Sequence, residues 1–204
     1  MTIGADVKWQ LRDIGVGFNI VRDSGTISGE FCYTEPNAQA TKPFIREFFL
    51  ESWFQYDTSV VEGDLIQFTT TNTPYLVMNK TPDIVENGII KYDGVLYKCN
   101  TSGEFLRPST AEVNYRKTNT WTSVKTNAYS LMTGIIFGSG IEEENQLIAV
   151  GLSRNELYVP ERYGIKQFDR YYPVSGEQPY IVNKVVKRRF PGIDVCELVE
   201  DNRQ

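Results

Sequence analysis

Short runs of alternating apolar and polar residues, separated by turn residues, dominate the chain. The pattern is clearest in IGVGFNIVRDSGTISGEFCY (residues 14–33), where alternation on both sides of Asp-Ser-Gly predicts a β-hairpin. Similar runs are GDLIQF, PYLVMNK, NGIIKYDG and VLYKCNTSGEFLR, with turn residues between them. Strands of this length at turn-separated intervals are typical of a β-barrel or β-sandwich. The pattern therefore predicts an all-β fold.

Three other segments have patterns of their own. The apolar residues of PFIREFFLESWFQY (43–56) fit both a helix face and a strand, and the aromatic content favours a strand. QLIAVGLSRNELYVP (146–160) is interpreted as a strand. In TWTSVKTNAYSLMTGIIFGSG (120–140) apolar residues recur at helical intervals, at Trp121, Val124, Ala128, Leu131 and Ile135. This spacing predicts a helix that follows a cap at Asn119 or Thr120 and ends at Gly138 and Gly140.

Two stretches share the spacing of an acidic residue, a Pro-Tyr pair and a valine. The shared residues are Asp64, Pro74, Tyr75 and Val77 in the first stretch and Asp169, Pro179, Tyr180 and Val182 in the second. Each spacing fits a hairpin whose returning strand starts at proline, because the missing N–H is then no loss to the ladder. The repeat fits an internal duplication, and it also fits two ordinary hairpins with the same turn chemistry.

The length of 204 residues allows one large domain or two small ones. We place a first barrel-like module at residues 14–107 and a second at 141–204, joined by a polar linker with the short helix at 108–140. Residues 1–13 lack clear periodicity and are interpreted as an N-terminal arm, in which Trp9 and Leu11 are available for docking. The predicted fold is all-β with minor α: two small β-barrel-like modules and one short helical segment.

The charge of the chain limits its partners. A net charge of −5 and a pI near 4.9 argue against a protein that wraps nucleic acid by neutralising phosphates. The sequence has no apolar run long enough to span a membrane, and its first residues lack a basic-then-apolar signal. We therefore expect neither a membrane partner nor Sec export.

The absence of histidine limits the chemistry. Ser-His-Asp and Cys-His sites cannot be assembled, and zinc sites lose their usual nitrogen ligand. Cys32, Cys99 and Cys196 are odd in number and far apart, which suits reduced, buried thiols. The glycine pairs at 15–17 and 138–140 lack the strand-and-helix context of a phosphate-binding loop, and no motif marks a carboxylate pair. We predict no catalytic residue, no cofactor and no metal site, and a protein that is not an enzyme.

A basic cluster lies near the C-terminus, in KVVKRRF, and comprises Lys184, Lys187, Arg188 and Arg189. It could contact a DNA backbone. It also fits a solvated edge strand, where lysines prevent unwanted pairing, or a salt-bridge surface toward another protein.

Two stretches of the chain resemble neck proteins of tailed bacteriophages, the head-closure or head-to-tail joining family. They are GDLIQF…PYLVMNKTPDIVENGIIKYDGVLYKCNTSGEFLR and ELYVPERYGIKQFDRYYPVSGEQPYIVNKVVKRRFPGIDVCELVED. In that family a small β-barrel carries a D-x-I…Y-x-V hairpin, and some members have a KCN strand. Family members are typically about half this length with one barrel, so two units and a helix-like insert depart from the pattern.

The resemblance implies a virion structural protein of the phage neck, made in the host cytoplasm and without catalysis. It implies a homo-oligomeric ring that joins the head to the tail and seals or gates the DNA channel. Its partners would be portal or adaptor proteins on one side and tail terminator or tail tube proteins on the other. Encapsidated DNA would pass through without sequence-specific binding. The stopper, adaptor and tail-terminator roles all stay open.

Four regions are candidates for contact with neighbours: the arm around Trp9, the loop after Pro36, the acidic loop Glu142 to Glu144 and the basic strand around Arg188. The alternative function is a carbohydrate-binding or baseplate or tail structural module of a phage, because 12 Tyr, 11 Phe and 3 Trp could supply a sugar platform. A hydrolase with paired carboxylates is a further rival.

Overall fold

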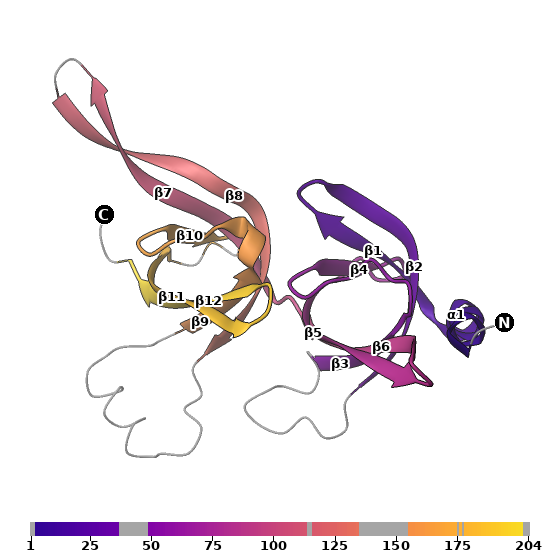
Figure 1. Ribbon diagram of the computed structural model, residues 1–204. Helices are drawn as coiled ribbons and strands as arrows, with labels where there is room; N and C mark the ends of the chain where they lie inside the picture. The colour runs from indigo at the N-terminus through magenta and orange to yellow at the C-terminus, as the bar shows by residue number, and fades with distance from the viewer. Residues whose placement is uncertain are drawn as a thin grey trace. The chain divides into compact units, whose positions relative to one another are not determined.

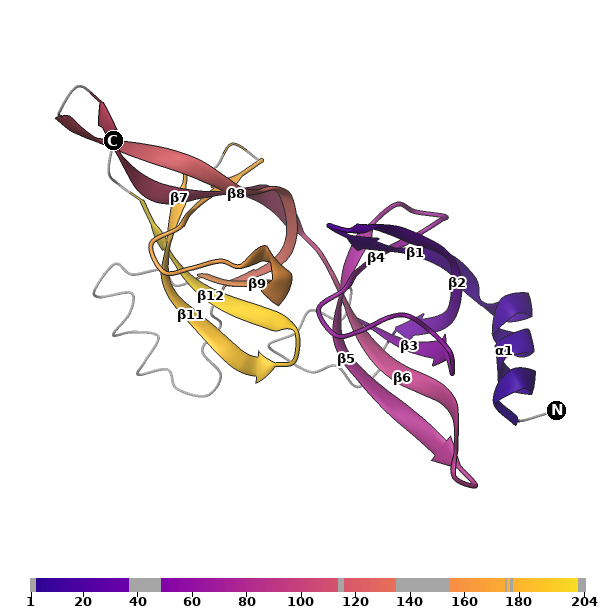
Figure 2. The same ribbon diagram turned by 45° about the horizontal axis from the view of Figure 1, so that its top comes forward.

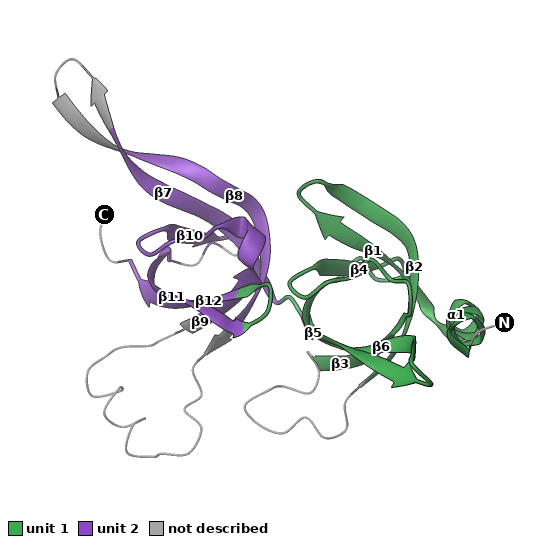
Figure 3. Cartoon of the chain, in the orientation of Figure 1, with its two compact units in different colours: residues 1–99, 190–193 green, residues 100–189, 194–204 purple. Residues whose placement is uncertain are grey.

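The computed structural model describes residues 3–36, 49–113, 116–134, 155–174, 176 and 178–201. The chain divides into two compact units, residues 1–99 with 190–193 and residues 100–189 with 194–204 (Figure 3). Each unit is built on a closed barrel of six antiparallel strands (Figure 1). The predicted all-β fold with two small barrels is therefore confirmed.

The described part of unit 1 consists of one helix and a six-stranded barrel. Its elements are α1 (Ile3–Ile14), β1 (Val16–Arg22), β2 (Gly25–Pro36), β3 (Phe49–Gln55), β4 (Leu65–Phe68), β5 (Pro74–Val85) and β6 (Gly88–Lys98). The barrel order is β1-β2-β3-β6-β5-β4, and pairing of β4 with β1 closes it. The hairpin predicted around Asp-Ser-Gly is β1–β2, and the described part of the ambiguous aromatic segment is strand β3, as its aromatic content favoured.

Unit 2 has the same strand order. Its elements are β7 (Thr101–Val113), β8 (Arg116–Gly134), β9 (Asn155–Pro160), the 3-10 turn η2 (Glu161–Tyr163), β10 (Arg170–Pro173), β11 (Tyr180–Phe190) and β12 (Ile193–Glu200). Around the barrel they follow one another as β7-β8-β9-β12-β11-β10. Each strand of unit 1 thus has a counterpart in unit 2, in the same chain order.

The registers of the two barrels also agree. Phe18 pairs with Phe68 and Ile20 with Ile66 in unit 1; at the corresponding places of unit 2, Gly103 pairs with Pro173 and Phe105 with Tyr171. The N–H of Val77 donates to the carbonyl of Asp64, and the N–H of Val182 donates to that of Asp169, both at 2.9 Å. Agreement in strand order, register and turn hydrogen bonds extends well beyond shared turn chemistry. We conclude that the two barrels are repeats of one structural unit.

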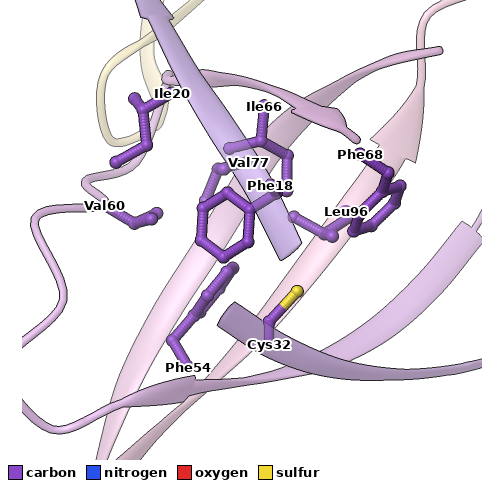
Figure 4. Close-up of a cluster of buried hydrophobic side chains, with 9 residues drawn as sticks. All are labelled: Phe18, Ile20, Cys32, Phe54, Val60, Ile66, Phe68, Val77 and Leu96. Atoms are coloured by element: carbon purple, nitrogen blue, oxygen red, sulfur yellow. The ribbon is translucent and has the colours of Figure 1, made fainter. Parts of the chain in front are cut away.

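The core of unit 1 is a cluster of apolar side chains inside the barrel (Figure 4). Its members are Phe18, Ile20, Cys32, Phe54, Val60, Ile66, Phe68, Val77 and Leu96. The rings of Phe18 and Phe54 meet edge to face with centroids 5.7 Å apart. Gly94 makes room for them, because a Cβ at this position would lie 2.4 Å from a ring carbon of Phe54. Gly94 is paired with Ser52, and the ring of Phe54 lies over the glycine, so the packing depends on a residue without a side chain at this place in β6.

Unit 2 fills its barrel with a different set of rings. The place of Phe18 is taken by Gly103, and the place of Ile66 is taken by Tyr171, which is fully buried. A Cβ at Gly103 would lie 2.5 Å from the Tyr171 ring, so the ring occupies the space above the glycine. The large side chain has moved from the first strand of the repeat to the fourth. The exchange keeps an aromatic ring in the core while removing sequence identity at both positions.

The helix predicted behind Asn119 or Thr120 is wrong: Arg116–Gly134 is strand β8, and residues 135–140 lie outside the described ranges. The register of β8 against β7 shifts twice, between Gly103 and Phe105 and between Phe105 and Leu106. Each shift adds one residue to β8, and a β-bulge of this kind breaks the period of two. Residues three apart on the two sides of one bulge, such as Lys125 and Ala128, therefore pair with residues of the same face of β7, and the alternation expected of a strand is lost.

The predicted N-terminal arm at 1–13 is also wrong in part, because Ile3–Ile14 forms helix α1. The helix docks on unit 1 through buried Gly4 and Leu11. A Cβ at Gly4 would lie 3.3 Å from the ring of Tyr56, and Lys8 forms an ion pair with Asp57. The sequence gives only a weak signal for this helix, because the four apolar residues Ile3, Val7, Leu11 and Ile14 at three- and four-residue intervals are its whole apolar stripe apart from Trp9.

The predicted module boundaries need correction as well. The units divide between Cys99 and Asn100, whereas the first module was placed at 14–107 and a linker at 108–140. Residues 108–113 and 116–134 of the stretch taken for a linker lie in strands β7 and β8. A two-stranded ribbon with solvent on both faces needs few apolar residues, which is why its sequence resembles a linker.

Candidate assembly surfaces

An arginine–aspartate clamp closes the turn before the fourth strand of unit 1. Asp64 lies before β4 and is 1% exposed. Its carboxylate accepts hydrogen bonds from Arg22 Nε at 2.9 Å and Nη2 at 2.6 Å, and from the Val61 N–H at 2.9 Å. Arg22 also donates to the Ser59 carbonyl at 2.8 Å. The bidentate geometry fixes the turn against strand β1.

The same clamp recurs in unit 2. Asp169 is also 1% exposed and accepts from Arg107 Nε at 2.9 Å, from Nη2 at 2.7 Å and from the Lys166 N–H at 2.8 Å. Arg107 donates further to the Gly164 carbonyl at 2.8 Å. In each unit the hydrogen bond with its aspartate raises the pKa of the arginine. Both carboxylate oxygens of Asp64 and of Asp169 thus accept hydrogen bonds that hold the turn, so the clamps are structural.

The hairpin β5–β6 extends beyond the body of barrel 1 (Figure 2). Strand β4 pairs with β5 only from Pro74 to Leu76, and β3 pairs with β6 only as far as Lys91. The tip from Ile84 to Ile90 is therefore a two-stranded ribbon. This tip is apolar and exposed, with Ile84 61%, Val85 40% and Ile89 39% exposed. Exposed apolar side chains on a ribbon that no barrel strand covers are typical of a protein contact surface.

A second ribbon belongs to unit 2, where β7 and β8 run together well past the barrel (Figure 1). Strand β10 pairs with β7 only from Gly103 to Leu106. Residues 108–110 and 120–123 of the ribbon are exposed at every position, so both of its faces meet solvent. An isolated two-stranded hairpin is marginally stable in water, so a ribbon of this length gains most from a partner.

Prolines protect the open edges of both ribbons. Pro82 lies in β5 and Pro108 in β7, each beyond the last residue that pairs with the neighbouring barrel strand. Proline cannot donate to a ladder, so it opposes the addition of another strand at an edge. The ribbons are therefore suited to contacts through their faces and tips.

The basic cluster is mostly occupied by partners within unit 2. Lys184 lies 3.5 Å from Glu197, Lys187 lies 3.7 Å from Asp194, and Arg189 lies 3.2 Å from Glu156. Arg188 is exposed and has a left-handed backbone, with φ of 65°. Three of the four basic side chains are thus in ion pairs with acidic residues of the same unit, and Arg188 is exposed. This arrangement differs from a continuous row of exposed cations that could bind a phosphate backbone.

The three tryptophan rings each have a cation of the same chain beside them. Arg12 lies 5.8 Å from the Trp9 ring centroid, Lys91 lies 4.6 Å from that of Trp53, and Arg170 lies 4.2 Å from that of Trp121. The Trp53 ring also packs on Tyr33 with centroids 5.1 Å apart. A sugar-binding platform needs an aromatic ring with an uncovered face, so these cation–π pairs argue against the hypothesis of a carbohydrate-binding module.

The predicted contact regions have different outcomes. Trp9 lies on helix α1 and is exposed, whereas Leu11 is buried, and contact of Trp9 with a neighbour stays a prediction. The loop after Pro36 and the acidic residues 142–144 lie outside the described ranges. The apolar tip of β5–β6 was missed. Its signal was the sequence DIVENGII, where adjacent apolar residues on both sides of a turn give a hairpin with two apolar faces.

Cys32, Cys99 and Cys196 are free and buried, and burial raises the pKa of each thiol, which opposes formation of the reactive thiolate. Within the described ranges, no group of three His, Cys, Asp or Glu side chains could hold a metal ion. No helix there is long and apolar enough to cross a membrane.

Asp194 on β12 is a buried acid with a poor partner. It is 1% exposed, Lys187 Nζ is 3.7 Å from its Oδ2, and neither carboxylate oxygen accepts a hydrogen bond within the described part of the chain. Burial is the main cause that raises its pKa above the ordinary 3.8; Lys187 opposes the shift and Glu161 adds to it. The ionised side chain therefore destabilises the fold at neutral pH.

Changing Asp194→Asn is expected to raise the free energy of unfolding by about 1 kcal/mol at pH 7, because a poorly paired buried charge is removed. Because the pKa of Asp194 is raised in the folded state, its side chain is protonated there as the pH falls toward 3.8. The free energy of unfolding of the wild type should then approach that of the variant. Urea unfolding at pH 7 and pH 4 measures both. A variant that is less stable than wild type at pH 7 would contradict this account of Asp194.

A scan against protein-family models and searches of curated proteins and of solved structures found no match to this chain.

Proposed function

We propose that the chain is a structural protein of the neck of a tailed phage, a ring component that joins the head to the tail and seals or gates the DNA channel. Its partners are further copies of itself, a portal or adaptor ring, and tail terminator or tail tube proteins. It works in the virion by binding proteins, and DNA passes without sequence-specific contact. The phage assignment rests on the sequence resemblance described above.

One structural observation supports an assembly role most directly. Both barrels carry ribbons that extend beyond the core, at the tip of β5–β6 and at β7–β8, and residues 108–110 and 120–123 of the second ribbon are exposed at every position. The ordering of residues in such ribbons costs conformational entropy that their own barrel does not offset. Protein partners that bury the apolar tip with Ile84 and Ile89 would recover this cost. Edge prolines direct these contacts to ribbon faces and keep copies from aggregating through open strands.

The acidic character of the chain suits a channel for DNA. A net charge of −5 leaves few free cations to hold phosphates, and most of the basic cluster is neutralised by Glu197, Asp194 and Glu156. A basic lining would bind DNA tightly and slow its passage. The alternative, a carbohydrate-binding or baseplate module, is less well supported because each tryptophan ring has a cation beside it.

Negative-stain microscopy of the purified chain mixed with portal complexes of the same phage tests the proposal. We expect rings of the chain seated on one end of the portal complex. The matched control is a chain with Ile84→Ser and Ile89→Ser, which keeps the barrel core and removes the apolar tip. The absence of any complex with portal or tail proteins, together with binding on a glycan array, would reject the neck role in favour of the alternative.

A further inference from the structure

The residue before each clamp aspartate has a left-handed backbone in both repeats. It is Gly63 in unit 1, with φ of 80°, and Phe168 in unit 2, with φ of 72°. Its N–H donates to the carbonyl of Val77 or Val182 at 2.8 Å in both units. The shared hydrogen bond shows that the turn requires this conformation. Glycine adopts it without strain, whereas a bulky residue does so at a cost.

The side chain of Phe168 buries little surface within its own unit, so packing there does not offset the backbone strain. Its side chain is 59% exposed, and its neighbours Lys166 and Gln167 are exposed as well. The backbone on its other side is fixed by Asp169 and Arg107, so the ring is held outward on a rigid turn. A strained and exposed aromatic residue on a rigid support is the arrangement of a contact residue.

The tip of the β5–β6 hairpin has matching properties. Its two-residue turn consists of Glu86 and Asn87, both left-handed, with φ of 49° and 64°. Asparagine tolerates this conformation, but glutamate has no such preference. Glu86 is exposed at the end of the ribbon, next to the apolar Ile84, Val85 and Ile89. The tip is thus an apolar surface with an acidic residue at its end.

We infer that the β5–β6 tip of one copy packs against Phe168 of a second copy, with Glu86 facing Lys166. Both surfaces are exposed and apolar, and their charges are complementary: an acid next to the isoleucines and a base next to the phenylalanine. The contact joins different patches on two copies, and head-to-tail contacts of this kind produce rings when the rotation closes. The inference rests on the proposed function, since it supplies the contact between neighbours in the ring.

Phe168→Gly is the first test, with sedimentation velocity over a range of concentrations and thermal unfolding as readouts. Self-association should weaken by at least about tenfold because an aromatic anchor is lost. The Tm should rise by about 2–4 °C because glycine relieves the backbone strain. A residue with a merely structural role would lower the Tm. Val174→Thr is the matched control, since Val174 is a still more exposed apolar residue just beyond the other end of β10 and should change neither quantity.

Charge exchange is the second test. Glu86→Lys and Lys166→Glu should each abolish self-association of the full chain when studied alone. An equimolar mixture of the two variants should associate again, because every tip then meets an opposite charge on its neighbour. An intramolecular contact would instead show no dependence on protein concentration.

Three results would overturn the contact: a wild-type chain that is monomeric at all concentrations, unchanged association in Phe168→Gly, or a charge-exchanged mixture that stays dissociated. A monomeric wild type that still forms rings on portal complexes would reject this contact and retain the neck role. Association through Phe168 without any binding to portal or tail proteins would support the contact and reject the neck role.

Discussion

Replacing Arg22 with methionine is expected to destabilise unit 1 by about 3 kcal/mol. The change removes both bonds to Asp64 and the bond to the Ser59 carbonyl, and it leaves a carboxylate that is 1% exposed without its cation. The turn before β4 then loses its attachment to β1, at the seam that closes the barrel. Hydrogen exchange with mass spectrometry during urea unfolding measures the loss separately in the two units.

The repeat supplies a matched control. Arg107→Met makes the same change in unit 2 and should lower protection there by a similar amount, while amides of unit 1 keep theirs. Adding Asp64→Asn to Arg22→Met should restore part of the stability, because the uncompensated charge is removed and an acceptor remains for the Val61 N–H. Loss of less than about 0.5 kcal/mol in both single variants would mean that the clamps act as ordinary surface ion pairs.

Phe18→Ala is expected to cost about 4 kcal/mol, the largest effect of any single change considered. The ring is 1% exposed and packs edge to face on Phe54 in the centre of the unit 1 core (Figure 4). Its removal leaves a cavity that Phe54 cannot fill without leaving its place over Gly94. Denaturant unfolding monitored by hydrogen exchange in unit 1 gives the value.

Ile14→Ala provides the comparison for Phe18→Ala. Ile14 is an apolar residue of similar chain position that is 66% exposed, and its truncation should change the stability by less than about 0.5 kcal/mol. A cost below about 2 kcal/mol for Phe18→Ala would indicate that the barrel interior collapses around the gap.

Much of the fold could be predicted from alternation and turn chemistry. The Asp-Ser-Gly turn fixes β1–β2, and the shared spacing from Asp64 to Val77 and from Asp169 to Val182 pointed to two equivalent hairpins. These are local signals, carried by residues close together in the chain. They were sufficient to indicate two small barrels.

The missed features depend on long-range contacts. Arg22 and Arg107 are ordinary arginines in the sequence, and only barrel closure brings them to their aspartates. The bulges in β8 come from its register against β7, so the spacing from Trp121 to Leu131 indicated a helix. Phe168 could be recognised only after it was aligned with Gly63, and that alignment requires the structure of both repeats.

Photo-crosslinking in the assembled phage particle tests the central claim that the ribbons bind proteins. A benzoylphenylalanine placed at Ile84 in one variant and at Trp121 in another would probe the two ribbons, and Ser24, in the exposed turn between β1 and β2, would serve as the control position. We predict crosslinks from positions 84 and 121 to copies of the chain or to portal and tail proteins, and few from position 24. Particles in which the ribbon positions crosslink no more than position 24, or which lack the protein altogether, would contradict the account.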